Sequence, residues 1–369
     1  MEHKDYTEIH PGTKVTRTIL NNLGSPDDSL KIIHIAGTNG KGSTAEYFTQ
    51  ILIAAGKKVG TFTSPAVYDF YDQFRIDGEP LSAEVAEKYF ERAACAAEGL
   101  GATDFEIQTA GVLLAFKEEG CEWAVVECGM GGLNDATNAI NKKELAVITS
   151  ISLEHTQYLG NTIAQICVQK AGIIKNCPVV VNDYQPTAAK KYFEKLGVCF
   201  AKGAGNLQQY NAATAAEGAK NLGIPEEAIR EGIENTKPRG RVEKFEAGGK
   251  TYIVDGAHNP AAFEPLRQCL YWLPRNEVTV VFGCLKDKDI EGNLDMLAGV
   301  CERVIAVECN SPRKMPLSEI ERYCKKYFDS VSTAQSVSEA LDLAYTKTVV
   351  VCGSFTLLKE AKLWIEKRQ

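Results

Sequence analysis

One short stretch of the chain combines the residue types that bind phosphate groups. An apolar run leads into a turn with three glycines around Lys41, and a helical pattern begins with Ser43 and Thr44. Glycines let backbone N–H groups approach phosphate oxygens, and the start of a helix adds a favourable dipole. Lys41 would neutralise phosphate charge, and either hydroxyl is suited to Mg²⁺. We therefore predict a phosphate-binding loop, although Gly42 between Lys41 and Ser43 departs from the common G-x-x-x-x-G-K-[ST] spacing.

A second glycine cluster, ECGMGG at 127–132, follows another apolar run. It is not a dinucleotide fingerprint, because G-x-G-x-x-G would require a glycine at Asn134. The cluster places Glu127 at the C-terminal end of a buried strand. Ligands bind at such strand ends in open α/β sheets, and a carboxylate there suits Mg²⁺. From residue types alone, a surface carboxylate explains Glu127 equally well, so both interpretations stay open.

Three further positions carry groups that could take part in chemistry. His155 follows a predicted strand, and Lys170 lies in a predicted helix. A capping role for His155 and a solvated role for Lys170 are the alternatives. In the second half, Asp255 and His258 share a compact loop of small residues. As a turn this loop needs no function; beside Arg241 it could close over a nucleotide.

Alternating strands and helices must position these residues in the first half. The apolar runs are continuous and rich in β-branched residues, which is typical of parallel strands covered by helices on both faces. Glycines stand where two of the helical patterns should end. We expect strands at 31–36, 58–63, 123–127, 145–151 and 178–181, and helices at 43–55, 83–97, 109–118 and 162–174.

A second, smaller α/β unit is expected after two consecutive helices at 206–222 and 225–234. The charged stretch KPRGR at 237–241 contains a helix breaker and marks the boundary. We thus predict domains at 1–236 and 237–369. In the second, Gly248 and Gly249 indicate a hairpin turn, and the other elements are strands at 242–245, 251–254, 278–282, 304–307 and 348–352, with helices at 260–272, 318–327, 337–344 and 355–366.

Composition excludes several other classes of function. The 369 residues include 41 Lys and Arg against 48 Asp and Glu, a net charge of −7, so a nucleic-acid or anionic-membrane surface is not expected. The 12 cysteines lack CxxC spacing and the five histidines are scattered, so zinc-ligand spacing is absent. No apolar run approaches a membrane span, and no apolar stretch follows the first residues. We expect a cytoplasmic protein whose thiols are reduced and act as small apolar groups.

Taken in order, the motifs of this chain resemble those of the Mur-type amide ligases, in particular the group of folylpolyglutamate and dihydrofolate synthases. Each motif is modest by itself, but the ordered set is specific and runs over nearly the whole chain. The motifs are HIAGTNGKGS at 34–43, TSP at 63–65, Phe105-Glu106, Glu127 with its glycines, DATN at 135–138, EHT at 154–156, KAGI at 170–173, Gly240-Arg241, DGAHNP at 255–260 and KDKD at 286–289.

The resemblance implies a Mur-ligase-like P-loop central domain with a parallel-rich sheet, a smaller Rossmann-like α/β C-terminal domain, and an active site between the two. It implies that ATP converts a substrate carboxylate to an acyl phosphate, which the amino group of L-glutamate attacks to form an amide. The cofactors are then ATP and two Mg²⁺ ions. The expected partners are small molecules only (a folate-like acid, L-glutamate and ATP) with no nucleic acid and no membrane, and the family suggests a monomer.

The resemblance also implies roles for individual residues, including a carbamylated Lys170. The catalytic set is Lys41, Glu127, His155 and Lys170, and the metal set is Ser64, Glu127, His155 and Lys170. The nucleotide set is Thr38, Asn39, Gly40, Lys41, Gly42, Ser43, Thr44, Asn211, Arg241, Asp255 and His258. The substrate set is Phe105, Glu106, Asn134, Asp135 and Ala136.

Electrostatics supports the modified lysine. An ammonium about 4 Å from a divalent cation would be repelled by about 8 kcal/mol at an effective dielectric of about 20. Carbamylation turns that cation into a carboxylate-like ligand. Some positions depart from the family pattern: Leu133 and Asn134 replace Arg and Leu, and Ala66 replaces His. The alternatives are therefore a Mur-family ligase acting on a non-folate carboxylate, or a nucleotide-binding paralogue without catalysis.

Overall fold

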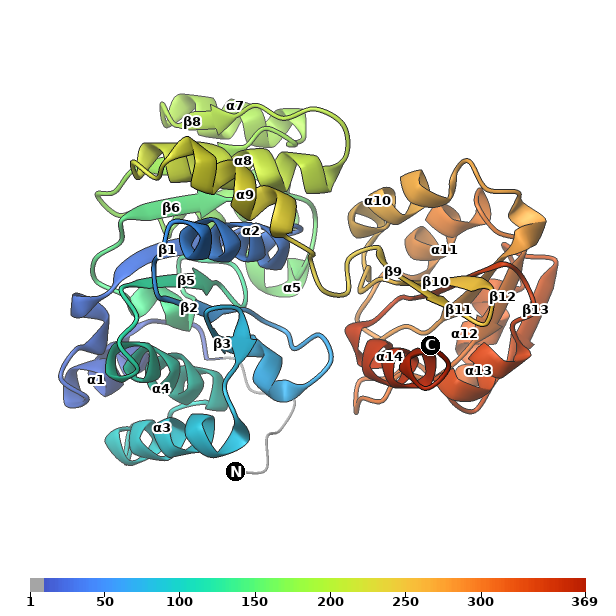
Figure 1. The fold of residues 1–369 in the computed structure, drawn as a ribbon, viewed down its shortest axis with the longest axis horizontal. Helices are drawn as coiled ribbons and strands as arrows, with labels where there is room; N and C mark the ends of the chain where they lie inside the picture. Colours follow the sequence, from blue (N-terminus) through green and yellow to red (C-terminus); the bar gives the residue numbers. More distant parts are fainter. Residues whose placement is uncertain (1–9) are drawn as a thin grey trace. The chain divides into compact units, whose positions relative to one another are not determined.

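The computed structural model describes residues 10–369, which form two compact units (Figure 1). The N-terminal unit extends to Ala66 and resumes from Tyr71 to Lys237, and the C-terminal unit comprises Val67–Phe70 and Pro238–Gln369. No pattern in the sequence indicated that Val67–Phe70 belongs with the second half. Its side chains contact that half directly, since the Tyr68 hydroxyl donates to Glu243 at 2.5 Å.

The N-terminal unit is built on a sheet of eight strands among the described residues. All neighbouring strands run parallel except at one edge, where β3 is antiparallel to both β2 and β4. The parallel-rich sheet expected from continuous apolar runs is confirmed. In spatial order the strands are β4 (Glu79–Pro80), β3 (Phe74–Ile76), β2 (Val59–Phe62), β5 (Trp123–Glu127), β1 (Lys31–Ala36), β6 (Leu145–Ile148), β7 (Val179–Asn182) and β8 (Cys199–Ala201).

Helices cover both faces of this sheet, and its central strands are therefore buried on both sides. Figure 1 shows α2, α8 and α9 beside one another and α3 paired with α4. The helices are α1 (Lys14–Asn22), α2 (Lys41–Ala54), α3 (Ala83–Ala96), α4 (Asp104–Glu118), α5 (Thr156–Leu159), α6 (Ile163–Ala171), α7 (Thr187–Lys195), α8 (Leu207–Asn221) and α9 (Glu226–Asn235), with 3-10 turns η1 (Pro26–Ser29), η2 (Phe70–Gln73) and η3 (Ala136–Ala139).

The C-terminal unit has a six-stranded sheet, parallel except for the hairpin partner β9. The predicted hairpin turn at Gly248 and Gly249 is confirmed. In spatial order the strands are β13 (Ser330–Thr333), β12 (Arg303–Ala306), β11 (Val278–Phe282), β14 (Thr348–Cys352), β10 (Lys250–Val254) and β9 (Glu243–Ala247). The helices are α10 (Pro260–Leu270), α11 (Ile290–Ala298), α12 (Leu317–Cys324), α13 (Val337–Leu343) and α14 (Leu358–Glu366), with 3-10 turns η4 (Arg275–Glu277) and η5 (Phe355–Leu357).

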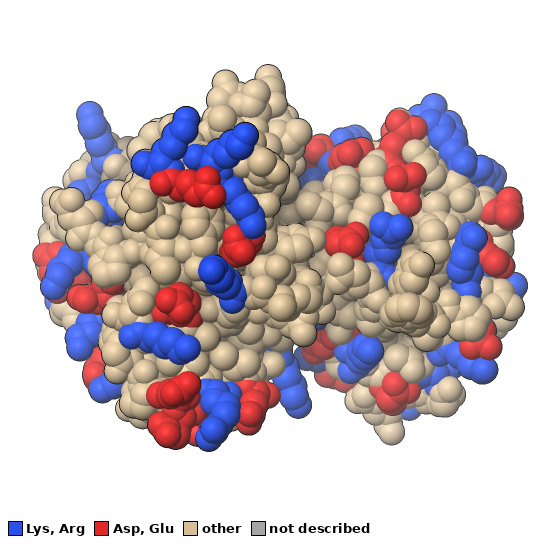
Figure 2. All heavy atoms as spheres, turned by 90° about the horizontal axis from the view of Figure 1, so that it is seen from above, with Lys and Arg blue, Asp and Glu red and all other residues tan. Residues whose placement is uncertain are grey.

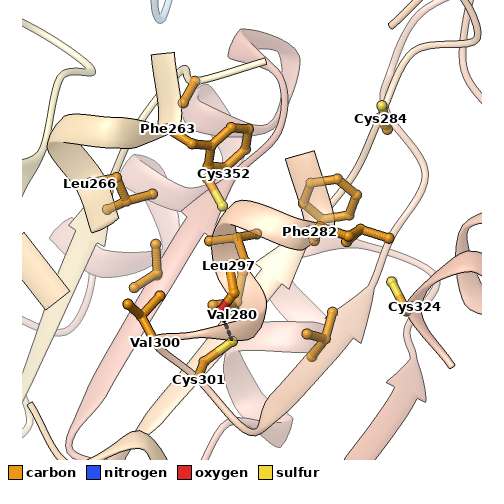
Figure 3. Packing of buried hydrophobic residues seen from close by; sticks show 14 of the residues in the cluster. Phe263, Leu266, Val280, Phe282, Cys284, Leu297, Val300, Cys301, Cys324 and Cys352 are labelled. Carbon is orange, nitrogen blue, oxygen red and sulfur yellow. Dashed lines mark hydrogen bonds between the residues drawn. The ribbon is translucent and has the colours of Figure 1, made fainter. Parts of the chain in front are cut away.

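Cysteines serve as core residues, as their sequence context predicted. All 12 are free thiols, and eight are buried. Figure 3 shows Cys301, Cys324 and Cys352 packed among aromatic and aliphatic side chains of the C-terminal unit, such as Phe282 and Leu297. Burial raises the pKa of Cys301 and of Cys324 to about 12, so these thiols stay neutral and unreactive.

The surface agrees with the modest net charge. Figure 2 shows acidic and basic side chains interspersed on the face in view, without a broad field of one sign. Within residues 10–369, no helix has the length and apolar character needed to span a bilayer.

Two differences from the sequence-based elements have local causes. Helix α4 begins at Asp104, not near Thr109, because Thr103 and Glu106 form a reciprocal capping box at its start. Strand β6 ends at Ile148, before the expected Ile151, because the next backbone groups bond to the turn after β1. The helices and strands that the sequence did not indicate are the short or polar ones: α1, α5, α7, α11, β3, β4, β8 and β13.

Substituting Gly60 by Ala in β2 should destabilise the N-terminal unit. An added Cβ would lie 2.3 Å from the ring of Phe116, which is fully buried. We expect a loss of about 1–3 kcal/mol in the free energy of unfolding, measured by urea denaturation. Gly299→Ala is the control, because nothing lies within 4 Å of its added Cβ and its φ is −79°. Equal unfolding curves for the two variants would contradict this packing argument.

Candidate active site

The glycine-rich turn after β1 is packed too tightly to carry side chains. An added Cβ at Gly37 would lie 1.8 Å from the Thr149 hydroxyl, and one at Gly40 would lie 2.5 Å from the Asn211 amide. Gly40 also has φ +92°, in the left-handed region, where it precedes the first residue of α2. The turn therefore follows a tight path that requires glycine and ends at a helix N-terminus.

The segment after β6 holds this turn in place. Thr38 N donates to Ser150 O at 2.8 Å. The Thr38 hydroxyl donates to Ser152 O at 3.1 Å and accepts from Ser152 N at 3.0 Å, while the Asn39 amide donates to the Ser152 hydroxyl at 3.3 Å. These bonds fix the position from which the chain continues to His155. His155 has φ +49° and occupies the N-cap position of α5, where its side chain makes no capping hydrogen bond.

Lys41 and Glu127 meet beside the turn, although they come from different elements. Lys41 Nζ lies 3.6 Å from Glu127 Oε1 and donates to Thr38 O at 3.3 Å. Glu127 Oε2 accepts from Ser64 N at 3.3 Å, and an added Cβ at Gly42 would come within 3.4 Å of the same oxygen. Glu127 is 3% exposed, so it is not the solvated surface carboxylate of the alternative interpretation.

The hydroxyl residues at the start of α2 are both buried. Ser43 Oγ accepts from the Gln208 amide at 3.2 Å. Thr44 Oγ1 has no hydrogen-bond partner among residues 10–369. Such an orphaned oxygen at a helix N-terminus is suited to an additional polar ligand. Asn211 lies one turn further along α8 and accepts from Asn182 at 3.2 Å, which holds its amide against Gly40.

Lys170 is buried in the last turn of α6 and points to the glycine-rich turn. Its Nζ donates to Gly37 O at 2.6 Å. Burial and the positive charge of Lys41 lower the pKa of Lys170 to about 8. The solvated role considered from the sequence is therefore wrong, since only 3% of Lys170 is exposed.

The second glycine cluster packs on the end of the helix that carries Lys170. An added Cβ at Gly132 would lie 2.8 Å from Gln169 O and 3.0 Å from Lys170 O. Leu133 N donates to Gln169 O at 2.7 Å. This contact ties the segment after Glu127 to the Lys170 helix.

The proposed metal ligands do not form an obvious carboxylate cluster. Within residues 10–369 there is no group of three or more His, Cys, Asp or Glu side chains placed to hold a metal ion. The predicted set contains only Glu127 and His155 of these types, with Ser64 and Lys170 besides. His155 lies 4.0 Å from Glu154. The donor chemistry thus fits Mg²⁺ only if a hydroxyl and a carbamylated lysine complete the set.

The predicted substrate residues lie in two segments. The half-buried Phe105 ring packs against Phe62 with 5.8 Å between ring centroids. The Glu106 carboxylate accepts from Thr103 N and from its hydroxyl, each at 2.9 Å, so it acts as a helix cap. This local role is shown by the structure, whereas a substrate contact is not.

The second substrate segment begins at Asn134, which is exposed and whose carbonyl accepts from Gly12 N at 2.9 Å. Asp135 is 6% exposed and accepts from Met130 N at 2.8 Å. Ala136 opens η3. Asn138, whose role the sequence did not indicate, donates to Leu133 O and Gly172 O, both at 3.1 Å. Its amide therefore fastens this segment to the residues that follow Lys170.

In the C-terminal unit, Arg241 and His258 lie around one aromatic ring, and Asp255 is near both of them. The Arg241 guanidinium is 4.6 Å from the centroid of Phe355, and the His258 ring is 6.0 Å from it. Asp255 accepts from Val242 N at 2.7 Å, and burial raises its pKa, with the Arg241 charge acting in the opposite direction. Sequence reasoning placed Phe355 only at the start of a helix. No local motif marks it, because its contacts come from distant segments.

Comparisons with known proteins agree with this arrangement. The Mur ligase middle domain matches residues 35–224, and the Mur ligase glutamate ligase domain matches residues 240–355. The dihydrofolate synthase/folylpolyglutamate synthase of Escherichia coli K12 is 32% identical over 402 residues, covering 100% of this chain and 94% of its own.

Solved structures agree as well. E. coli FolC in complex with DHPP and ADP has a TM-score of 0.89 and 29% identity, covering 100% of this chain and 96% of its own. A bifunctional folylpolyglutamate synthase/dihydrofolate synthase with Mn, AMPPNP and L-glutamate bound has a TM-score of 0.86 and 28% identity, covering 98% and 96%. The chain therefore belongs to the Mur ligase family, in its group of folylpolyglutamate and dihydrofolate synthases.

Proposed function

We propose that this protein is an ATP-dependent amide ligase that adds L-glutamate to a folate through an acyl phosphate. The observation that carries the proposal is the pair formed by the half-buried Lys41 and the buried Glu127, 3.6 Å apart beside a glycine turn that ends at a helix N-terminus. A related enzyme binds Mn, AMPPNP and L-glutamate together, which correspond to the divalent metal, the nucleotide and the amino acid of this reaction. Dihydrofolate synthase activity is part of the proposal, because the E. coli relative carries both names.

The turn from Thr38 to Thr44 would hold the phosphates of ATP. Its backbone N–H groups and the α2 N-terminus offer donors and a positive dipole end to the phosphate oxygens. Lys41 would weaken its 3.6 Å contact with Glu127 and neutralise charge on the transferred phosphate. Asn211 would contact the nucleotide from α8. We also propose nucleotide contacts for Arg241, Asp255 and His258 in the C-terminal unit.

Ser64, Glu127, His155 and carbamylated Lys170 would hold two Mg²⁺ ions. The unpartnered Thr44 hydroxyl and the carboxylate oxygens of Glu127 are the kind of ligands that such hard cations prefer. When bound, these ions would offset the repulsion between the substrate carboxylate and the phosphate oxygens. The chain's own contribution is positioning: Ser64 N holds Glu127, and Gly37 O holds Lys170.

The acid substrate would contact Phe105 and the segment Asn134, Asp135 and Ala136, with Glu106 capping the helix that carries Phe105. We further propose that the protein is a cytoplasmic monomer. A non-folate carboxylate is the second candidate substrate. It is favoured by Leu133, an apolar residue that is 42% exposed directly before the substrate segment, where the family pattern has arginine.

ADP release from the purified protein tests the substrate. ATP, Mg²⁺ and L-glutamate would be supplied with folate, dihydropteroate or a panel of other carboxylates. Release that depends on both glutamate and a folate or dihydropteroate supports the proposal. Release with another carboxylate alone would establish the second candidate, and no acid-dependent release would refute ligase activity.

Lys41→Ala should abolish turnover while leaving the fold intact. The substitution removes the cation beside the phosphate turn, and we expect kcat to fall at least about 100-fold. Circular dichroism and thermal unfolding report the fold. Lys57→Ala is the matched control, because Lys57 is an exposed lysine that pairs with the exposed Glu122 at 3.5 Å. Wild-type activity in Lys41→Ala would refute the phosphate-turn assignment.

Lys170 should form a carbamate when Mg²⁺ and bicarbonate are present. Only the neutral amine reacts with CO₂, and the lowered pKa of about 8 makes that form accessible. The ¹³C carbamate signal from labelled bicarbonate should therefore be stronger above about pH 8 than well below it.

Matched lysine variants identify the source of that signal. Lys170→Arg should lose it. Lys143→Arg should keep it, because Lys143 lies outside the proposed metal site. Lys143 is a matched control, since burial also lowers its pKa, to about 7, and its Nζ also donates to a backbone carbonyl, Ile173 O. A signal that persists in Lys170→Arg would contradict the assignment.

A further inference from the structure

A chain of buried polar side chains lies beside the proposed substrate segment, and the chemistry above does not use it. Thr137 Oγ1 is 2.5 Å from Asp135 Oδ1 and 2.8 Å from His34 Nε2. The Cys128 sulfur is 3.1 Å from the same ring nitrogen. His34 and Thr137 have no exposed surface. A hydrogen-bonded chain thus occupies a place in the core where apolar packing would be expected.

The hydrogen-bond chemistry gives this chain a direction. Burial raises the pKa of Asp135, whereas its hydrogen bonds from Thr137 and Met130 act in the opposite direction and stabilise the carboxylate. The Thr137 hydroxyl has one proton, and an ionised carboxylate can only accept it. The hydroxyl oxygen must then accept from His34, so the ring proton is on Nε2. This leaves Nδ1 of His34 unprotonated, and Nδ1 has no partner among residues 10–369. The ring is neutral, because burial, followed by the charges of Lys143 and Lys175, holds the pKa of His34 well below its usual range.

The chain leaves one acceptor position of Asp135 for a ligand. Oδ1 accepts from Thr137 N at 3.0 Å and from the Thr137 hydroxyl, and Oδ2 accepts from Met130 N at 2.8 Å. A carboxylate has about four acceptor positions. Three are used, so the fourth is on Oδ2. Two donors hold Oδ1 in place and so fix the orientation of the whole carboxylate. The free acceptor position on Oδ2 therefore points in one direction.

The four residues come from three parts of the proposed site. His34 lies on β1, which leads into the phosphate turn, and Cys128 directly follows Glu127. Asp135 belongs to the substrate segment, and Thr137 directly follows that segment. We propose that Thr137 is a positioning residue which, oriented by His34, aligns the Asp135 carboxylate toward an N–H donor of the acid substrate. This inference rests on the proposed function, in which Asp135 contacts that substrate.

Replacement of the Thr137 hydroxyl tests the proposal in steady-state kinetics. Thr137→Val keeps the shape but removes the bond to Asp135, and we expect the KM for the acid substrate to rise about tenfold, the usual effect of losing a hydrogen bond to a charged group. The KM for ATP should change by less than about twofold, because a hydroxyl bond to Asp135 acts on the acid substrate alone. Thr137→Ser keeps the hydroxyl and should restore the wild-type KM for the acid.

A buried threonine outside the site is the matched control. Thr279 on β11 is 2% exposed and pairs its hydroxyl with Thr346 at 2.8 Å. Thr279→Val should therefore leave both KM values unchanged. Equal acid KM values in Thr137→Val and Thr137→Ser, or an equal rise in both KM values of Thr137→Val, would overturn the proposal.

The tautomer of His34 gives a readout that does not depend on activity. In ¹⁵N-labelled protein, the proposal requires His34 to carry its proton on Nε2 in the wild type and in Thr137→Ser. In Thr137→Val the ¹H and ¹⁵N chemical shifts of the Nε2–H group should change, because its oxygen acceptor is gone. A proton on Nδ1 in the wild type would overturn the proposal. A wild-type enzyme that turns over no folate would instead refute the proposed function, with the His34 result still deciding whether the chain of bonds exists.

Discussion

The close approach of backbone to side chain at the glycine-rich turn constrains the rest of the site. The space that a side chain at Gly37 or Gly40 would need is filled by Thr149 and Asn211. Because the turn is packed on both sides, its carbonyl and amide groups have fixed directions. The Gly37 carbonyl can then receive Lys170, and the next residues can pair with Ser150 and its neighbours. A turn with side chains would lose these contacts together.

This packing gathers charges that would be costly to bury one at a time. Lys41 pairs with Glu127, but among residues 10–369 Lys170 has a backbone carbonyl and no ion-pair partner. Burial and Lys41 both disfavour its charged form, which is why its pKa falls. A neutral or carbamylated Lys170 removes that conflict. The electrostatics of the turn therefore favour anionic ligands and a modified lysine for the same reason, the positive charges of Lys41 and Lys170 beside it.

The sequence predicted an element correctly where the hydrophobic pattern of that one segment is enough to identify it. Strands β1 and β5 begin and end as predicted, because each is a continuous apolar run that is buried on both faces. Helix α7 was missed because its buried face consists of little more than Ala189 and Phe193 in a polar stretch. Gln208 and Phe355 were missed for another reason. Each acts through contact with a distant segment, Ser43 for one and Arg241 for the other, and no local pattern encodes such a partner.

The segment Val67–Phe70 links two site residues that belong to different motifs, Ser64 and Arg241. Glu243 Oε2 accepts both the Tyr68 hydroxyl, at 2.5 Å, and Gly240 N, at 2.6 Å. One carboxylate oxygen thus holds a residue four positions after Ser64 and the residue just before Arg241. Ser64 is proposed to bind metal and Arg241 to bind nucleotide. A change at Glu243 would therefore loosen the backbone leading to both residues at once, although Glu243 belongs to none of the motifs.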